Sequence, residues 1–307
     1  MAIRSTSFWL DSPLPTSATP EVDAPSRLSE AVGVAGLLGI ELMGWQRLVL
    51  GRALQVDGGR PVFREVDLST PRQVGKSTLT LIAALRKMLY EEGSWVTYTT
   101  ASRLAGRRKL LQLWWPLILR SPLASMFSVS RGTGSEALEC SNGSVFLLLS
   151  GDEASGHGDS IDLAFLDEAW SLSESSEQAV RPAMASRSAA QLWVYSTAGT
   201  SRSVFWRSKV EAGREAAKAG LVSSTMFVEW SAADVQNPTS DELVWPTFHP
   251  GLGRTIDVGT MRADLEADVT PSKSEWLRAY GNLWPDETAA GWGVISLDEW
   301  RRATGGG

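Results

Sequence analysis

The residues that decide the fold of this chain are Thr70-Pro71-Arg72-Gln73-Val74-Gly75-Lys76-Ser77. A strand-like segment, 62–68, precedes them, and a strong helical pattern, 79–89, follows. Glycine, lysine and serine in this order between a strand and a helix are typical of a phosphate-binding loop. Consecutive backbone N–H groups surround the polyphosphate, and the helix N-terminus adds the positive end of its dipole. We therefore predict a nucleotide-binding P-loop, in which Lys76 neutralises phosphate charge and the Ser77 hydroxyl ligates Mg²⁺.

The loop departs from the common pattern at its first position, where Thr70 replaces the usual glycine. The tripeptide Gly-Lys-Ser by itself should arise by chance about 0.1–0.2 times in a chain of this length at ordinary residue usage. A second motif is therefore needed to support the prediction. The predicted nucleotide-binding residues of the loop and of the helix start are Thr70, Pro71, Arg72, Gln73, Val74, Gly75, Lys76, Ser77 and Thr78.

The second motif is Leu163-Ala164-Phe165-Leu166-Asp167-Glu168. Four apolar residues that end in an acidic pair are typical of a buried parallel strand that delivers carboxylates at its C-terminal end. In a P-loop enzyme Asp167 would hold the Mg²⁺ shell, and Glu168 would deprotonate the water that attacks the γ-phosphate. Taken alone, such a pair is more often a strand end that enters a surface turn. Together with the P-loop it predicts an ATPase, and the absence of an Asn-Lys-x-Asp guanine-reading motif argues against a GTPase.

A third element, residues 191–200, is an apolar strand pattern that runs into a turn rich in hydroxyl side chains. Such a turn is ordinary chemistry for the end of a strand. In third position behind the two motifs above, we interpret its residues Ser196, Thr197 and Ala198 as an element that senses the γ-phosphate and relays its presence to a moving part.

The rest of the chain alternates strand and helix patterns, and Asn142-Gly143 is a strong hairpin signal. This alternation predicts an α/β fold with a mostly parallel central sheet and helices on both faces. The expected elements, in chain order, are a mostly helical segment 27–54, a strand 62–69, a helix 76–91, a strand 95–100, a helix 101–119, a hairpin 137–149, and strands at 163–168 and 191–197.

In these motifs the chain resembles the ATPase half of the large terminase subunit, the genome-packaging motor of tailed bacteriophages. The resemblance rests on four features: Trp45-Gln46 as the family's adenine-reading glutamine motif, 72–77 as its deviant Walker A motif, 163–168 as Walker B with the catalytic glutamate, and 196–198 as its coupling motif. It extends from about Glu41 to Arg302. The resemblance implies an additional-strand, catalytic-glutamate P-loop core, followed by a small lid or linker subdomain.

The resemblance also implies a set of partners and cofactors. ATP and Mg²⁺ would be the cofactors, and double-stranded DNA, the portal protein and the small terminase subunit would be the partners. The subunits would form a ring, expected to be a pentamer, on the procapsid, and the protein would work in the host bacterial cytoplasm and at no membrane. The chain would hydrolyse ATP to drive double-stranded DNA into the procapsid.

Arginines complete the active sites of such motors. The resemblance implies a catalytic role for Arg72 within its own loop, beside Lys76 and Glu168, because a planar guanidinium bonds phosphate oxygens bidentately. An arginine from the adjacent subunit is also expected, and the candidates are Arg103, Arg107, Arg108 and Arg131. The alternative for the run Arg107-Arg108-Lys109 is a solvated helix face, the commoner meaning of such a run. In the glycine-rich loop 151–160, His157 is interpreted as a loop residue.

Composition shifts divide the chain into four expected parts. Residues 1–27 are rich in proline, serine and threonine and are predicted to form an extended arm. The P-loop ATPase core is expected at 28–203 and the lid or linker subdomain at 204–302, where tryptophan and proline increase. Residues 303–307 are expected to be a tail at the point where the family's nuclease domain begins, so DNA cutting is not expected of this chain.

Bulk composition excludes several classes of protein. At 307 residues the chain has room for one large α/β domain and a smaller one. No apolar run of about 18 residues indicates a transmembrane helix. A single cysteine, Cys140, excludes an internal disulfide, and with two histidines a structural zinc site is not expected. The net charge of −6 means that any contact with DNA must be local, because non-specific DNA binding depends on Lys and Arg contacts to phosphate.

Two other functions stay open on the sequence. A superfamily-2-like helicase or translocase also combines a glutamine motif, a P-loop and an Asp-Glu pair, but it needs a second RecA-like domain. The residues after Thr200 are too few for that domain and lack a Gln-x-x-Gly-Arg run. The second alternative is an adaptor that binds ATP as a switch without hydrolysing it. Glu168 argues against the adaptor, because a protein that only binds nucleotide needs no general base.

Overall fold

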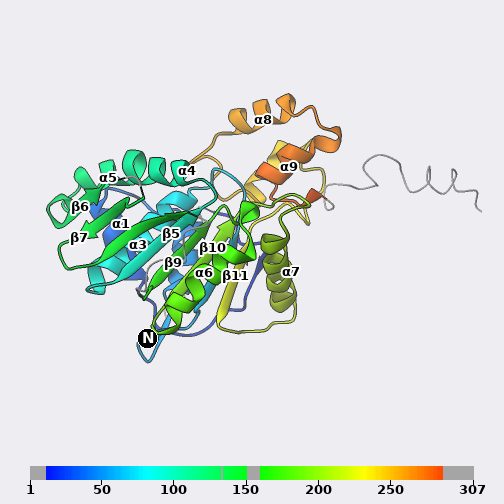
Figure 1. The fold of residues 1–307 in the computed structure, drawn as a ribbon. Coiled ribbons are helices and arrows are strands. Elements are labelled where there is room, and N and C mark those ends of the chain that lie inside the picture. The colour runs from blue at the N-terminus through cyan, green and yellow to red at the C-terminus, as the bar shows by residue number, and fades with distance from the viewer. Residues whose placement is uncertain (1–11, 133, 151–159, 286–307) are drawn as a thin grey trace, which may run out of the picture.

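The computed structural model describes residues 12–132, 134–150 and 160–285, and a nine-stranded sheet forms the centre of this part of the chain (Figure 1). The loop that contains His157 and the tail 303–307 lie outside these residues. Across the sheet the strands are β1 (Ser17–Ala18), β11 (Thr225–Glu229), β4 (Glu65–Ser69), β10 (Gln191–Ser196), β9 (Leu163–Asp167), β5 (Trp95–Thr100), β8 (Val145–Ser150), β7 (Ala137–Cys140) and β6 (Phe127–Ser130). A separate pair, β2 (Val56–Asp57) and β3 (Arg60–Pro61), is antiparallel.

The six central strands, from β11 to β8, are parallel. Strands β9, β10 and β11 carry near-continuous apolar runs because helices cover both faces of the sheet. Strand β10 lies between β4, which leads into the P-loop, and β9, which ends in the acidic pair: Val194 pairs with Asp67 on one side and with Leu166 on the other. An extra strand between these two is the additional-strand arrangement that the resemblance to the terminase family implied. The α/β fold with a mostly parallel sheet is confirmed.

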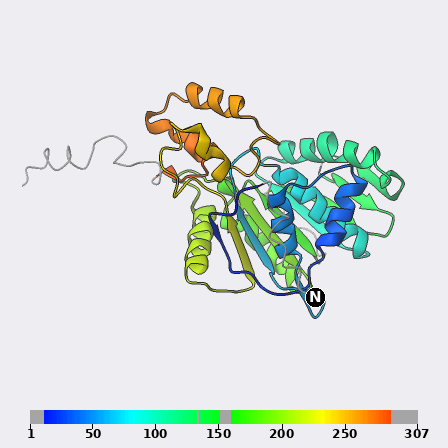
Figure 2. The same ribbon diagram turned by 180° about the vertical axis from the view of Figure 1, so that it is seen from behind.

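Helices cover both faces of the sheet (Figures 1 and 2). On one face, α1 (Leu28–Leu37), α2 (Gly44–Ala53) and α3 (Lys76–Tyr90) bury a large apolar cluster. On the other face, α6 (Glu174–Ala185) and α7 (Val204–Lys218) form a second cluster with Trp284. The helices connect strands that run in the same direction. The carboxyl ends of the central strands therefore lie together at one edge of the sheet.

The expected helix at 101–119 proved to be three consecutive segments: α4 (Arg103–Arg108), the π-helical η2 (Lys109–Trp114) and α5 (Trp115–Leu119). A physical reason is Pro116 near the start of α5. Proline has no N–H to donate to the carbonyl four residues earlier, so the regular α-helical ladder cannot continue through this point. The expected hairpin at 137–149 is confirmed: β7 and β8 are antiparallel neighbours, and Gly143 in the turn has φ = 85°.

The structure moves the start of the lid. The sequence analysis placed residues from Val204 onwards in the lid, but β11 lies beside β4 in the central sheet, and α7 belongs to the second apolar cluster. The composition of the segment did not reveal this, because only the hydrogen bonds between β11 and β4 show that β11 belongs to the central sheet. The predicted N-terminal arm is ordered in its described part, where β1 pairs with β11 and Ser26 bridges to Gln55.

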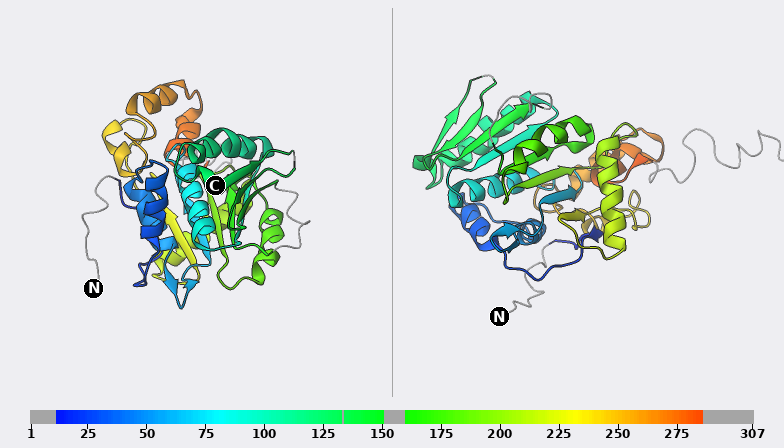
Figure 3. Two further views of the ribbon diagram at one scale, coloured as in Figure 1. Left: turned by 90° about the vertical axis from the view of Figure 1, so that its left-hand side faces the viewer. Right: turned by 60° about the horizontal axis from the view of Figure 1, so that its bottom comes forward.

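A third apolar cluster begins at Ala232 and ends at Leu283 and forms the core of the lid. Its helical elements are η5 (Glu242–Thr247), α8 (Val258–Ala267), η6 (Pro271–Lys273) and α9 (Ser274–Tyr280). The remaining short helices of the described chain are η3 (Ala124–Met126) and η4 (Ala169–Ser171). Figure 3 (left) shows the lid, in orange, at the same end of the sheet as the α4–α5 stretch. The P-loop lies at this end, and the lid is hydrogen bonded to its backbone.

Candidate nucleotide-binding site

The P-loop joins the end of β4 to the start of α3 and contains two residues in the left-handed region, Gln73 with φ = 58° and Gly75 with φ = 92°. Gly75 is the N-cap of α3. A Cβ atom at this position would lie 3.0 Å from both Gln46 Nε2 and Met43 Cε, so space and backbone angle together require glycine. The loop therefore ends at the N-terminus of α3, where the positive end of the helix dipole favours an anion.

Lys76 points back across the loop. Its Nζ donates to the Pro71 carbonyl at 2.7 Å and to Thr70 Oγ1 at 3.0 Å, with Thr197 Oγ1 at 3.5 Å. Thr70, which replaces the usual glycine, thus supplies a hydroxyl ligand to the lysine. Burial lowers the pKa of Lys76 to about 8 against the opposing charge of Asp167, and the positive charge of Lys109 lowers it further.

Asp167 is the buried carboxylate of the site, with a side-chain exposure of 5%. Its Oδ2 accepts from the hydroxyl of Tyr98 and from Lys109 Nζ, the latter at 2.7 Å. Its Oδ1 accepts from the backbone N–H of Glu168 at 2.7 Å. Burial, and then the neighbouring carboxylate, raise the pKa of Tyr98 well above its ordinary value, so the phenol keeps its proton and donates it.

Glu168 is far more accessible, with 41% of its side chain exposed. It has φ = 57°, a left-handed conformation that is uncommon for a residue with a Cβ atom. The turn separates two adjacent carboxylates: Asp167 stays under the sheet edge, while Glu168 reaches the pocket. Thr100 Oγ1 donates to Glu168 Oε2 at 3.3 Å and positions it.

These side chains line one pocket of about 350 Å³ at the C-terminal edge of the sheet. Most of the predicted catalytic and coupling residues meet there, together with two, Lys109 and Trp170, that the sequence did not single out as site residues. The lining residues are Arg72, Gln73, Lys76, Ser77, Lys109, Asp167, Glu168, Trp170, Ser196 and Thr197. The pocket therefore brings together residues from the loop and helix that follow β4 with residues from the ends of β9 and β10, which lie far away in the chain.

The predicted coupling segment, residues 196–198, is hydrogen bonded to three other parts of the structure. The Ser196 carbonyl accepts from the N–H of Thr70 at 3.0 Å, and Ser196 Oγ accepts from the N–H of Trp170 at 3.2 Å. Ala198 is buried and faces the lid, where its N–H donates to Asn282 Oδ1 at 2.6 Å. The segment thus touches the P-loop, the Walker B turn and the lid.

The predicted glutamine motif occupies a different place from the pocket. Trp45 is 1% exposed, with its ring centroid 5.7 Å from that of Trp230, so it packs in the core and does not line the pocket, and its contact with nucleotide stays a prediction. Gln46 lies behind the loop: Oε1 accepts from the N–H of Met43 at 3.0 Å, and Nε2 donates to the Gly75 carbonyl at 3.1 Å. The Nε2 end of its amide supports the loop, and the Oε1 end caps the start of α2. Val74 is likewise buried, and Thr78 lies outside the pocket lining.

The four candidate trans-acting arginines fall into two pairs. Arg103 and Arg107 both bond the buried Glu136, at 2.7 and 2.5 Å. Burial alone would raise the pKa of Glu136, but the hydrogen bonds from these two arginines lower it to about 2. Arg108 and Arg131 are exposed, and in the described ranges their guanidinium groups have no hydrogen bond or ion pair.

Arg72 lies at the mouth of the pocket, and the lid holds its backbone on both sides. Its N–H donates to the Ala279 carbonyl at 2.8 Å, and its carbonyl lies 3.0 Å from His249 Nε2. Burial lowers the pKa of His249 to about 4, so the ring is neutral at pH 7 and Nε2 carries the hydrogen that the Arg72 carbonyl accepts. Thr255 Oγ1 donates to the next carbonyl, that of Gln73.

The site has the donors that Mg²⁺ prefers. The Ser77 hydroxyl and the Asp167 carboxylate are hard oxygen ligands on the same pocket wall. Among the described residues, no group of three or more His, Cys, Asp or Glu side chains could hold a metal ion. Mg²⁺ is commonly held by one or two carboxylates together with substrate phosphates and water, so this donor set fits an ion that arrives with a nucleotide.

The sequence missed several residues of the site. Lys109 was grouped with Arg107 and Arg108 as a solvated face, yet it is the direct cationic partner of Asp167. Trp170 lines the pocket and has the guanidinium of Arg278 5.9 Å from its ring centroid. A lysine 58 residues before Asp167 carries no local signal of that contact. For Trp170 the sequence offered one signal, its position two residues after the Walker B glutamate Glu168.

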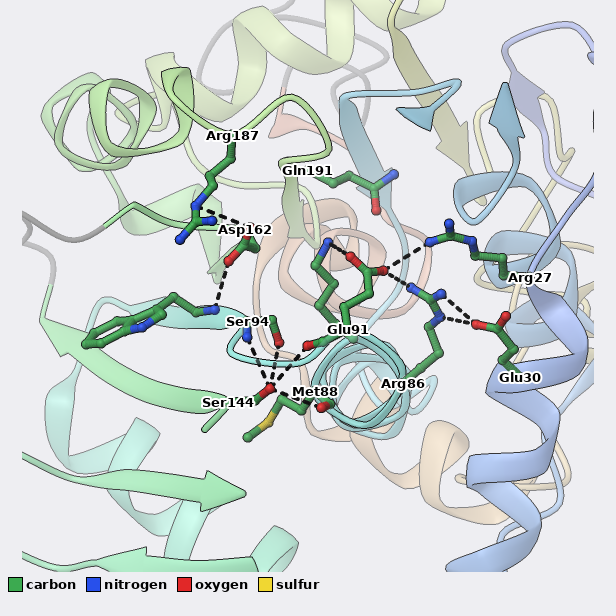
Figure 4. A network of polar contacts seen from close by, with 12 residues as sticks. Arg27, Glu30, Arg86, Met88, Glu91, Ser94, Ser144, Asp162, Arg187 and Gln191 are labelled. Atoms are coloured by element: carbon green, nitrogen blue, oxygen red, sulfur yellow. Dashed lines mark hydrogen bonds and ion pairs between the residues drawn. The ribbon is translucent and has the colours of Figure 1, made fainter. Parts of the chain in front are cut away.

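A second polar network lies away from this pocket, at the C-terminal end of α3 (Figure 4). Arg86 is 4% exposed and bonds both Glu30, from α1, and Glu91 at 2.6 Å. Lys87 and Arg27 also bond Glu91. The adjoining cavity is only about 40 Å³. Because these charges are paired with one another, we interpret the network as a structural tie between α1 and α3.

The fold and the pocket together define a P-loop protein of the additional-strand, catalytic-glutamate class. Solved structures with this fold include the large terminase of bacteriophage HK97 (TM-score 0.71, 16% identity, 85% of this chain and 56% of that chain covered). They also include the ATPase domain of the large terminase of Thermus phage P74-26 (TM-score 0.56, 16% identity, 81% and 96% covered). The chain spans little more than half of the length of the HK97 protein. No curated protein sequence matches it.

Residues 67–243, more than half of the chain, match the family described as terminase large subunit, T4likevirus-type, N-terminal. The chain therefore belongs to this terminase large-subunit family. At 16% identity the structural likeness establishes the fold, while the family match comes from the sequence itself.

Proposed function

We propose that this chain is the ATP-hydrolysing motor part of a viral DNA-packaging terminase. The observation that carries the proposal is the convergence of Lys76 from the P-loop and Glu168 from the end of β9 on one pocket, with the buried Asp167 beside them. Phosphoryl transfer to water requires a group that neutralises the phosphate charge, a ligand for the metal and a general base. The membership in the terminase family supports the same reaction.

Each residue has a separate task in this reaction. Lys76 and the N–H groups at the start of α3 bind the phosphates, and Ser77 and Asp167 hold the metal. The bound Mg²⁺ would neutralise charge on the phosphate oxygens. Glu168, exposed and bonded by Thr100, takes a proton from the attacking water, and Arg72 at the pocket mouth bonds the γ-phosphate. Gln46 holds the loop from behind and would reach adenine only after leaving the Gly75 carbonyl.

Hydrogen bonds to the lid can transmit changes in the pocket to the rest of the molecule. Ala198, at the end of the coupling segment, and Arg72, in the P-loop, are both hydrogen bonded to the lid, through Asn282 and Ala279. A change in the pocket therefore displaces groups that the lid contacts directly. We propose that lid movement transmits hydrolysis to double-stranded DNA.

The proposed partners follow from the terminase family. We propose that the subunits form a ring, expected to be a pentamer, on the portal protein of a procapsid, with the small terminase subunit delivering the DNA. The work would take place in the host bacterial cytoplasm and at the procapsid. In the described part of the chain no helix is long and apolar enough to cross a membrane. The net charge of −6 favours brief, local DNA contacts over a tight grip.

Neither alternative from the sequence gains support. The match of residues 67–243 to a terminase large-subunit family favours the packaging motor over a superfamily-2-like helicase. A nucleotide-gated adaptor that does not hydrolyse ATP needs no exposed carboxylate beside the metal ligand, and Glu168 is one.

The test is single-turnover ATP hydrolysis by three proteins: wild type, Glu168→Gln and Lys76→Ala. Glu168→Gln should bind ATP with near wild-type affinity yet hydrolyse it about 10²–10⁴-fold more slowly, the usual contribution of a general base. Lys76→Ala should lose nucleotide binding or turnover. A Glu168→Gln protein that keeps wild-type turnover on its portal would show that another group is the base.

A further inference from the structure

Lys109 occupies the side of Asp167 that faces the nucleotide pocket. Its Nζ lies 2.7 Å from Asp167 Oδ2 and 2.9 Å from the Tyr98 hydroxyl oxygen, and it lines the same pocket as Ser77. Asp167 and Ser77 are the residues proposed to hold the metal. An ammonium group and a divalent cation repel each other strongly at such distances, so both cannot bond the same carboxylate oxygen at full strength.

The helical framework fixes the position of Lys109. It begins the π-helical η2, and Trp114 at the other end of η2 is buried and donates its Nε1–H to the Ser77 carbonyl at 3.2 Å. The Trp114 ring meets the Tyr98 ring edge-on, with centroids 5.1 Å apart. In α4, Gly106 permits a close approach to β8, because a Cβ atom there would lie 2.5 Å from Leu148 Cδ1. The π-helical segment thus touches the P-loop helix and the Walker B strand at once, and such segments are frequent at functional sites.

Asp167 needs a cation when no metal is bound. Only 5% of its side chain is exposed, and a buried carboxylate without a countercharge is costly. Tyr98 and the Glu168 N–H are neutral donors. Lys76 is directed to the Pro71 carbonyl and the Thr70 hydroxyl, so Lys109 is the cation that bonds Asp167 directly.

We propose that Lys109 is a counter-ion that a divalent cation displaces: it holds Asp167 in the metal-free protein and leaves when the metal binds. The next partner within reach is Glu168, whose Oε1 lies 3.7 Å from Nζ. Lys109 is then a positioning residue that links metal arrival to the charge around Glu168. This inference rests on the proposed function for the assignment of Asp167 to the metal, and it is tested without ATP hydrolysis.

The first experiment measures Mn²⁺ binding by electron paramagnetic resonance in the absence of nucleotide. Lys109→Met removes the charge and keeps the length of the side chain. Arg120→Gln is the matched control, because Arg120 is exposed at the end of α5 and removing it takes away one positive charge at a distance from Asp167. Lys109→Met should bind Mn²⁺ about tenfold more tightly than wild type, in line with the effect of one charge on a neighbouring carboxylate. Equal or weaker binding relative to Arg120→Gln would overturn the proposal.

The second experiment follows thermal unfolding with EDTA and then with excess Mn²⁺. Lys109→Met should melt at a lower temperature than Arg120→Gln in EDTA and should gain more from Mn²⁺. In an Asp167→Asn background the same Lys109 substitution should cause no further loss, because the carboxylate it neutralises is gone. An additional loss of the same size in that background would show that Lys109 acts by packing alone.

If Lys109→Met does not fold, the wild-type protein provides the test. In a crystal structure with Mn²⁺ bound at Asp167, Lys109 Nζ should no longer be within hydrogen-bond distance of Oδ2, and finding it still there would overturn the proposal. Failure of this proposal and failure of the proposed ATPase function give different results. A protein without ATPase activity can still show metal displacement, and an active ATPase can bind Mn²⁺ with no effect of Lys109.

Discussion

Asn282 Oδ1 accepts a hydrogen bond from the backbone N–H of Ala198, at 2.6 Å. The Nδ2 group of the same side chain donates to Ser69 Oγ at 2.9 Å and to the Trp230 carbonyl at 2.8 Å. One amide, fully buried at the base of the lid, therefore joins residues at the ends of β4, β10 and β11. These are the strand that leads into the P-loop, the coupling strand and the strand before the lid. The lid is thus bonded directly to the strand that leads into the P-loop and to the strand that we propose senses the nucleotide.

Asn282→Ala should destabilise the protein by about 2–6 kcal/mol, because it leaves the buried Ala198 N–H and Trp230 carbonyl without their partner and each such group costs about 1–3 kcal/mol, while Ser69 Oγ keeps its bond to Glu229. Asn237→Ala is the matched control: Asn237 has the same φ of 53° but is exposed, so it reports the cost of placing alanine in a left-handed conformation. Urea unfolding monitored by tryptophan fluorescence gives both values. Equal losses in the two variants would mean that the Asn282 hydrogen bonds contribute nothing.

The four candidate trans-acting arginines should separate into a structural and a catalytic pair. Arg103→Ala or Arg107→Ala should each cost about 1–3 kcal/mol in the monomer, because each removes a bond to the buried Glu136. Arg108→Ala and Arg131→Ala should leave monomer stability within about 0.5 kcal/mol of wild type. If one of these two acts in a neighbouring site, its loss should lower assembled turnover by about 10³–10⁵-fold.

The measurement for this pair is turnover as a function of protein concentration, with the oligomeric state followed by sedimentation. Activity of the wild type should rise with ring formation, and a mixture of Glu168→Gln with the critical arginine variant should recover part of it. High turnover by a species shown to be monomeric would contradict the requirement for a neighbour. Full assembled activity in both Arg108→Ala and Arg131→Ala would return the role to Arg103 or Arg107.

The free energy of unfolding should decrease as the pH falls, because of His249. The folded-state pKa of about 4 lies below the ordinary value of 6.5, so the unfolded chain takes up the proton first as the pH falls. The stabilisation is complete above pH 6.5 and is lost between pH 6.5 and 4, and the full loss is about 3 kcal/mol. His249→Gln should flatten this part of the pH profile, measured by urea unfolding at several pH values. The chain has one other histidine, so His157→Gln is the control and should keep the wild-type slope.

Arg72→Lys should slow ATP-driven DNA packaging far more than it weakens ATP binding. Charge at the pocket mouth survives, but the planar guanidinium that bonds two phosphate oxygens at once does not. The backbone bonds of Arg72 to Ala279 and His249 are unaffected, so the loop should keep its shape. Packaging rates are compared with nucleotide affinities for Arg72→Lys and Arg72→Ala. Wild-type packaging by both variants would leave Arg72 without a role in catalysis or sensing.

The amino-acid sequence by itself determined the P-loop, the acidic pair after β9 and the parallel sheet that joins them. Each can be predicted from a pattern of neighbouring residues in the chain. Glycine at position 75 suits the left-handed backbone of the loop, and the apolar run 163–166 is typical of a strand that is covered on both faces. Because the carboxyl ends of parallel strands share one edge, such local motifs also predict where the site forms.

Only the tertiary structure decided which side chains complete that site. Arg107 and Lys109 are two positions apart, yet one bonds Glu136 and the other Asp167, because residues two apart on a helix point in different directions and η2 changes the helical phase. Trp45 turned into the core instead of the pocket, and β11 joined the sheet beside β4. Side-chain direction and strand order are set by contacts between segments far apart in the chain, and a linear pattern contains no record of those contacts.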